Sequence, residues 1–183
     1  TNEINRLIIS SYTLKKAILE EIPIRDVISE RMDNILPDFS TYDNHTLSNE
    51  IKIVELLRSL LLLILNELII KYGQDLKNNQ WTLRPLSDII ISFSIMDSNI
   101  KFFNSISEKL QNNCIEVLKV SNHKNFKIAY QEARNIIINE QLKLKIFEDI
   151  EDKINQINYD FDVLGFKKKI VNKLYKNKKY YLD

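Results

Sequence analysis

Residues able to do chemistry are few and scattered in this sequence. It contains one cysteine, Cys114, and two histidines, His45 and His123, which stand far apart in polar stretches. No Gly-rich phosphate loop, HExxH motif or cluster of cysteine and histidine occurs. The serines, histidines and aspartates show no spacing typical of a catalytic triad. The histidines are therefore expected to be solvated, and the sequence predicts neither a catalytic residue nor a metal site within the chain.

Two charged runs are the remaining candidates for a function. The acidic run "IFEDIEDKI" (146–154) is predicted to be the solvated face of a helix. The basic run "GFKKKIVNKLYKNKKYY" (165–181) places lysines among aromatics, a pattern that can bind phosphates or RNA. The whole chain has 26 basic and 25 acidic residues, a net charge of +1, so a solvated face is favoured here too. No nucleic-acid partner is expected.

The composition indicates a helical protein with a packed core. Of 183 residues, 44% are hydrophobic and 28% charged, while only two are glycine and three proline, which disfavours turn-rich β architectures. With a single cysteine no internal disulfide can form, and a reducing, cytoplasmic location is expected. The chain begins at Thr1 with neither Met nor a targeting segment, so we expect it to be part of a longer protein.

The first half of the chain should form three helices. Apolar residues at three- and four-residue spacing predict a helix over 2–19, among them Ile4, Leu7, Ile8 and Leu14, and Pro23 should end it. A short helix over 24–35 and a polar loop over 36–46 follow, with Ser48 as the predicted N-cap of the next helix. That helix, over 49–72 and ended by Gly73, is the most apolar segment and should lie at the centre. Its longest uninterrupted apolar run has six residues, whereas a bilayer span needs about 20.

The second half should contain the remaining helices of an all-α bundle of about five to seven helices. A fourth helix should begin near Asp75 or Asn78 and reach Ser107. Pro85 lies inside this range, so either the helix begins at Pro85, as its first residue, or it kinks there. Its apolar face should include Trp81. The stretch "QNNCIEVLKVSNHKN" (111–125) is predicted to be an irregular connection. The pattern over 125–154 predicts one long helix or two with a break, and a last helix is expected over 163–175.

The opening words "TNEINRLII" resemble the acyl-CoA dehydrogenase family. In that family a helix begins immediately after a segment of the form Glu-Gly-Thr-x-(Glu/Gln)-Ile, and in many members the Glu of that segment is the catalytic base. The chain starts at the matching Thr. The resemblance therefore implies that the base lies just outside this sequence, and that the isolated chain is inactive.

Two further stretches resemble the very-long-chain, bacterial branch of the same family. The segment "NELIIKYGQDLKNNQWTLRPLSDIIISFSIMDS" (66–98) is similar to its appended C-terminal region, where Ser87 replaces the usual Ala and Pro85 a frequent Arg. The matched positions are Lys71, Gly73, Gln80, Leu83, Leu86 and Asp88. The ending over 166–183 is similar to the basic helix and tail that close bacterial members. The resemblance implies that residues 1–22 are the last helix of the catalytic C-terminal domain and residues 23–183 an appended helical domain.

The resemblance also implies a reaction and a cofactor. The parent enzyme would introduce an α,β double bond into a fatty acyl-CoA, as in fatty-acid β-oxidation, with FAD as the hydride acceptor. Thr1 and Glu3 correspond to family positions that touch FAD, and a helix N-terminus suits its pyrophosphate. Arg6 matches a commonly basic position, or forms an ordinary surface ion pair. The implied partners are the remainder of the dehydrogenase chain, a second copy in a homodimer, and electron-transfer flavoprotein.

Two other classes of function remain open. One is an all-helical interaction module that takes no part in catalysis. The other is a peripheral membrane bundle, in which the basic C-terminal run and exposed apolar faces would bind lipid in a manner that salt weakens.

Overall fold

The computed structural model describes residues 2–31, 35–157 and 162–177, and in these ranges the chain is a helical bundle. It has seven α-helices and no strand in the described ranges, and 84% of the structure is helical, which confirms the all-α prediction. The helices are α1 (Asn2–Ile18), α2 (Ile24–Arg31), α3 (Ser48–Tyr72), α4 (Gln80–Ser105), α5 (Glu108–Asn139), α6 (Phe147–Gln156) and α7 (Val163–Asn177). Short 3₁₀ helices, η2 (Ser40–Tyr42) and η3 (Gly73–Asn78), lie on either side of α3 in sequence. No helix in the described ranges is both long and apolar enough to cross a membrane.

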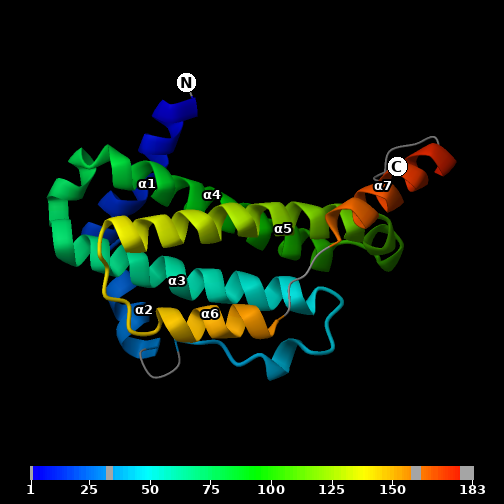
Figure 1. Ribbon diagram of the computed structural model, residues 1–183, viewed down its shortest axis with the longest axis horizontal. Helices are drawn as coiled ribbons and strands as arrows, with labels where there is room; N and C mark the ends of the chain where they lie inside the picture. The colour runs from blue at the N-terminus through cyan, green and yellow to red at the C-terminus, as the bar shows by residue number, and fades with distance from the viewer. Residues whose placement is uncertain (1, 32–34, 158–161, 178–183) are drawn as a thin grey trace.

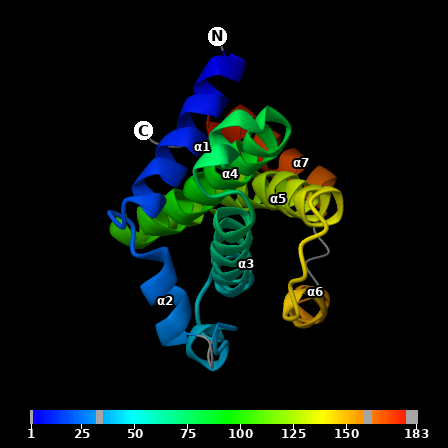
Figure 2. The ribbon, with the colours of Figure 1, turned by 90° about the vertical axis from the view of Figure 1, so that its left-hand side faces the viewer.

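Helix α3 runs through the middle of the bundle, as its composition predicts. Viewed along the long axis, α4 and α5 lie above it, with α1, α2 and α6 around its other sides (Figures 1 and 2). Twelve of its residues are buried, and several of them, including Ile53, Leu56, Ile64 and Leu68, have no exposed surface. The broad apolar girth of this helix is buried because other helices pack on several of its sides.

The helices begin and end close to the predicted residues, but some of the residues at their ends have other roles than predicted. Gly73, with φ +52°, ends α3 as expected, and its N–H donates to the Ile69 carbonyl. Helix α3 starts at Ser48 itself, so Ser48 is its first residue and not its N-cap. Helix α1 ends before Pro23, because Glu20 adopts a left-handed conformation (φ +60°). The N–H of Glu21 bonds back to the Lys16 carbonyl in a Schellman motif.

Helix α4 differs from the sequence expectation at its start. It begins at Gln80, so Pro85 lies inside the helix and not in its first position. Proline has no N–H to donate, and the carbonyl that loses its partner is that of Trp81, one turn earlier. The Trp81 side chain is 90% exposed, so the prediction that it joins the apolar face is wrong.

The stretch 111–125, predicted to be irregular, is helical throughout as part of α5. Its buried side chains recur every three or four residues and form one continuous inner face of Cys114, Leu118, Asn122, Phe126, Ala129, Ala133 and Ile136. His123 is also buried, so the prediction of a solvated His123 is wrong. Of the two alternatives left open for 125–154, the structure shows two helices with a break, because α5 ends at Asn139 and α6 begins at Phe147.

One buried acid should weaken the fold at neutral pH. Glu50, in the first turn of α3, is only 3% exposed, and burial raises its pKa, although Lys119 lowers it in part. Because the folded-state pKa lies above the unfolded value of about 4.3, stability falls as pH rises through the interval between them. We expect E50Q to raise the Tm at pH 7 by a few degrees, since about 1 kcal/mol corresponds to about 2–4 °C here.

The control for E50Q is E108Q, which alters an exposed acid in the first turn of α5. E108Q should leave the Tm unchanged or slightly lower, because it removes a favourable charge at a helix N-terminus. The advantage of E50Q should shrink as the pH falls through the raised folded-state pKa of Glu50 and should be lost below about pH 4. Equal Tm values for E50Q and wild type at pH 7 would show that the buried carboxyl does not destabilise the fold.

Candidate functional site

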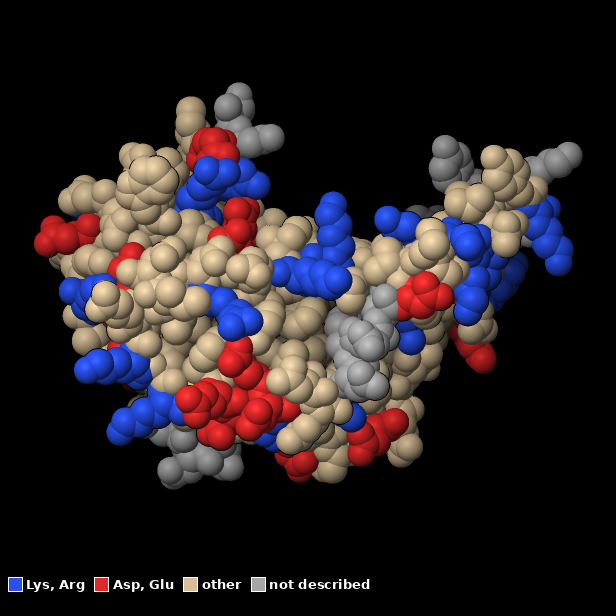
Figure 3. All heavy atoms as spheres, in the orientation of Figure 1, with Lys and Arg blue, Asp and Glu red and all other residues tan. Residues whose placement is uncertain are grey.

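The site predicted from the resemblance lies at the N-terminal end of α1. Thr1 lies outside the described residues, so its role stays a prediction. Glu3 is in the first turn of α1, and its side chain is 57% exposed. One carboxylate oxygen of Glu3 lies 3.0 Å from Arg6 Nη1, and the other lies 3.4 Å from Arg84 Nε on α4. Acidic and basic side chains therefore gather near this end of the molecule (Figure 3).

The structure brings together two stretches that carry the family resemblance. Arg6 Nε lies 2.8 Å from Asp88 Oδ1, and the Ser87 hydroxyl donates a hydrogen bond to the Arg6 carbonyl. The Ser that replaces the usual Ala thus ties α1 directly to α4. Arg6 forms ion pairs with Glu3 and Asp88. An ion pair was one of the two roles expected for Arg6 from the sequence.

These contacts leave the N-terminal end of α1 able to face an anion. Arg6 and Arg84 balance the charges of Glu3 and Asp88, so Glu3 does not present an unpaired negative charge. The first N–H groups of a 17-residue helix have no partner within the helix, and its dipole is positive at this end. An unpaired Glu3 would repel a phosphate. With its charge balanced, this end of α1 is electrostatically compatible with a phosphate-bearing cofactor.

Helix α1 carries apolar side chains on its outside as well as its inside. Ser10 and Leu14 are buried against the bundle, whereas Ile4, Ile8 and Tyr12 are 63%, 57% and 58% exposed. The sequence placed Ile4 and Ile8 on the buried face, and that assignment is wrong. Because the three exposed residues are four apart, they form a single stripe, here called the outer face of α1.

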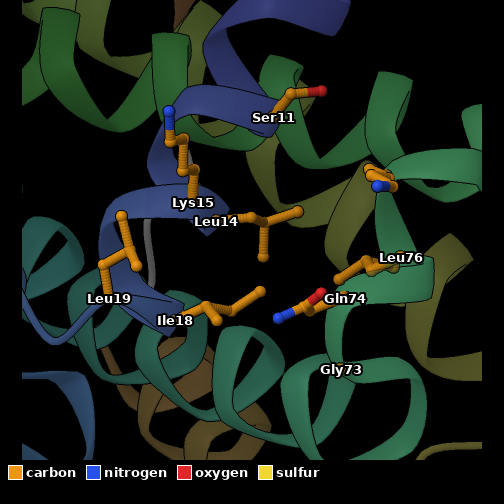
Figure 4. Close-up of a pocket in the computed structure, with 9 residues that line it drawn as sticks. Ser11, Leu14, Lys15, Ile18, Leu19, Gly73, Gln74 and Leu76 are labelled. Atoms are coloured by element: carbon orange, nitrogen blue, oxygen red, sulfur yellow. The ribbon is translucent and has the colours of Figure 1, made fainter.

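A groove continues this stripe toward the C-terminal end of α1. It lies between α1 and η3 and has a volume of about 410 Å³ (Figure 4). Its walls are mainly apolar, formed by Leu14, Ile18, Leu19 and Leu76 together with Ser11, Lys15, Gly73, Gln74 and Lys77. The apolar spacing predicts α1 as a helix but indicates neither its outer face nor the groove. The four-residue repeat from Ile4 to Tyr12 is the pattern that could have indicated them.

A second polar cluster, unpredicted from the sequence, joins α3 and α4 to the end of α5. The Glu140 carboxylate accepts hydrogen bonds from Lys71 Nζ at 2.8 Å and from the hydroxyls of Tyr72 and Thr82. Asn79 Nδ2 adds a longer contact at 3.4 Å. We call these five residues the Glu140 cluster. Because its donors come from α3, α4 and the residue before α4, the cluster ties these parts of the bundle to the end of α5.

Other reactive side chains do not converge. No group of three or more His, Cys, Asp or Glu in the described ranges could hold a metal ion. His45 Nε2 lies 3.0 Å from Asn104 Oδ1, and its Nδ1 accepts the backbone N–H of Leu47. These bonds anchor the loop before α3 to the end of α4. The site that can be built from the described residues is therefore the N-terminal end of α1 with its outer face.

Comparison with known proteins identifies a related fold. No family model matches the sequence, and no curated protein matches it. The fold is similar to part of a solved structure, an acyl-CoA dehydrogenase complexed with FAD from Bacillus anthracis, with a TM-score of 0.76 and 19% sequence identity. The match covers 98% of this chain and 31% of that one, so this chain spans about a third of the length of the dehydrogenase.

Proposed function

We propose that this chain is the C-terminal helical part of an FAD-dependent acyl-CoA dehydrogenase. The observation that carries the proposal is the fold likeness, which extends over 98% of the chain to part of a dehydrogenase solved with FAD. The contact of Arg6 with Ser87 and Asp88 supports it, because it joins the two segments of strongest family resemblance. Residues 1–22 would be the last helix of the catalytic C-terminal domain, and residues 23–183 the appended domain of a very-long-chain-type enzyme.

In this proposal the N-terminal end of α1 faces FAD. Thr1 would supply a hydroxyl and Glu3 a polar contact, while Asp88 and Ser87 hold the first turns of α1 in place. Bound flavin supplies the hydride acceptor for dehydrogenation of the acyl chain. The chain's own part is orientation, since the base that removes the α proton would lie upstream of Thr1.

The outer face of α1 would pack on the remainder of the enzyme. Ile4, Ile8 and Tyr12 expose an apolar stripe that such packing would bury, and the groove beside it could receive a further apolar side chain. The proposed assembly is a homodimer in the cytoplasm that acts in fatty-acid β-oxidation and passes electrons to electron-transfer flavoprotein. The appended bundle would support the catalytic core and the dimer.

The test uses the full-length protein that contains this chain. We expect it to purify with bound flavin, and the flavin absorbance to bleach when a long-chain acyl-CoA is added. I8D should reduce the flavin-to-protein ratio after gel filtration severalfold, because it places a charge on the proposed packing face. The matched control is I138D, which alters an isoleucine that is 66% exposed on α5. The isolated 183-residue chain should neither retain FAD nor oxidise acyl-CoA.

Each outcome separates this proposal from the interaction-module alternative. A full-length protein without flavin, or with flavin that acyl-CoA does not reduce, would favour the interaction module. Equal flavin retention by I8D and I138D would show that the outer face of α1 does not pack on the flavin-binding part. Turnover by the isolated chain would also contradict the proposal, because the proposed base is not in it.

A further inference from the structure

Helix α7 extends away from the main bundle, and one of its sides is not covered by any of the residues that the structure describes. It extends from the far end of the molecule and packs mainly on α5 (Figure 1). Lys173 Nζ lies 2.7 Å from the Glu116 carboxylate and donates to the Asn112 carbonyl at 3.1 Å. Phe166 and Ile170, on the same side of α7 as Lys173, are half-buried. These contacts fix which side of α7 faces the bundle.

The opposite side of α7 carries an apolar stripe. Leu164, Val171 and Tyr175 are 63%, 46% and 80% exposed. At 3.6 residues per turn, these three side chains project within about 40° of one another. We call them the outer stripe of α7. An isolated exposed leucine is unremarkable, but three aligned apolar residues over a whole helix indicate a surface that is covered in use.

Lysines border this stripe. Helix α7 contains Lys167, Lys168, Lys169, Lys173 and Lys176 and no acidic residue. Lys167 and Lys168 lie within about 60° of the stripe in helical projection, on opposite sides of it. Neither of them, nor Lys176, has a recorded ion pair within the described ranges. Positive side chains consequently gather over this end of the molecule (Figure 3), although the whole chain is nearly neutral.

We propose that the outer stripe of α7 and its flanking lysines bind the surface of an anionic lipid bilayer. An interfacial helix has an apolar stripe that enters the headgroup region, with lysines beside it that meet negative headgroups. Single-stranded RNA fits less well, because bases need planar side chains to stack on and two of the three stripe residues are aliphatic. The inference does not depend on the proposed dehydrogenase function, since it uses only α7 and its packing on α5.

Vesicle sedimentation tests this inference on the intact protein. We expect the protein to co-sediment with phosphatidylcholine vesicles that contain about a third phosphatidylserine, and not with phosphatidylcholine alone. Each lysine near an anionic surface contributes about fivefold in affinity. The K167A/K168A variant should therefore bind at least tenfold more weakly, and raising the salt concentration should weaken wild-type binding. The V171S/Y175S variant should bind weakly at every salt concentration, because it removes the apolar contribution.

The matched control is K143A/K145A, which removes two exposed lysines from the connection between α5 and α6, at the other end of α5. It should bind vesicles like wild type, and circular dichroism should show unchanged helix content in every variant. Lack of binding to anionic vesicles would overturn the inference. So would equal binding by the α7 and control variants, or binding to a labelled oligouridine in the absence of vesicle binding.

Discussion

Replacing Ile64 with lysine is expected to lower the free energy of unfolding by roughly 3–5 kcal/mol. Ile64 lies in the middle of α3 and has no exposed surface. A lysine there must either bury an unpaired ammonium or force neighbouring helices apart. Leu63, the preceding residue, is only partly buried, so Ile64 is the stricter test of a central α3. Thermal melting followed by circular dichroism should show a Tm lower by about 10 °C or more.

The control for I64K is I70K, on the same helix. Ile70 is 64% exposed and lies in the last turn of α3, where a positive charge is favourable. We expect I70K to change the Tm by no more than a degree or two, because surface substitutions stay within about 0.5 kcal/mol. Equal melting of I64K and wild type would show that α3 is not the packed centre of the bundle.

Hydrophobic periodicity was sufficient to predict the central helix and the bundle. Residues 49–72 are apolar on most sides, and no arrangement of this chain could bury them except at the centre. Periodicity was less informative for α5, because its N-terminal half is rich in asparagine, which has a low helix propensity. In this half of α5, contacts with other helices determine which residues face inward. Asn99 Nδ2 on α4 donates to Asn122 Oδ1 at 2.8 Å, so a polar residue becomes part of the inner face.

The ends of α1 and α5 are formed in the same way. Glu20 and Gln141 both adopt positive φ, of 60° and 52°, two residues after the last residue of each helix. The N–H of Leu142 bonds back to the Ile137 carbonyl, as in the Schellman motif of α1. Glycine is the residue normally searched for at this position, and neither end has one. The break after α5 therefore could not be located from composition.

The candidate site was only partly predictable for a geometric reason. Glu3 and Arg6 were found from local sequence, because they lie in one short motif. Their partners Arg84 and Asp88 come from α4, and only the crossing of α1 over α4 brings these side chains together. Likewise, spacing alone showed that α1 has apolar positions, but not which of them the bundle leaves exposed. Contacts between distant segments require the tertiary arrangement, which periodicity does not supply.

Replacing Glu140 with glutamine is expected to lower the free energy of unfolding by roughly 2–4 kcal/mol at neutral pH. The Glu140 side chain is only 12% exposed and accepts hydrogen bonds from Lys71, Tyr72 and Thr82. A glutamine keeps one acceptor oxygen but turns an N–H donor toward other donors. Because Lys71 is 40% exposed and can return to water, the loss should fall short of that for a fully buried ion pair.

The pH dependence of E140Q distinguishes loss of a charge from loss of packing. Burial alone would raise the pKa of Glu140, but the hydrogen bonds from Lys71, Thr82 and Tyr72 outweigh it and lower the pKa. The stability that Glu140 contributes is therefore fully present above the unfolded pKa of about 4.3, and is lost as pH falls through the lower folded value. Urea unfolding should show the full difference between wild type and E140Q at pH 7 and a smaller one below about pH 4.

The matched control for E140Q is E148Q, an exposed acid in the first turn of α6. E148Q should lower stability by less than about 1 kcal/mol, because only a helix-dipole interaction is weakened. A difference between E140Q and wild type that stays constant from pH 7 to pH 3 would mean that shape, and not charge, accounts for the role of Glu140. The Glu140 cluster joins α3 and α4 to the end of α5, and η3 is the segment that links α3 to α4. Losing the charge of Glu140 should therefore also loosen η3, whose Gly73 and Leu76 line the groove beside α1.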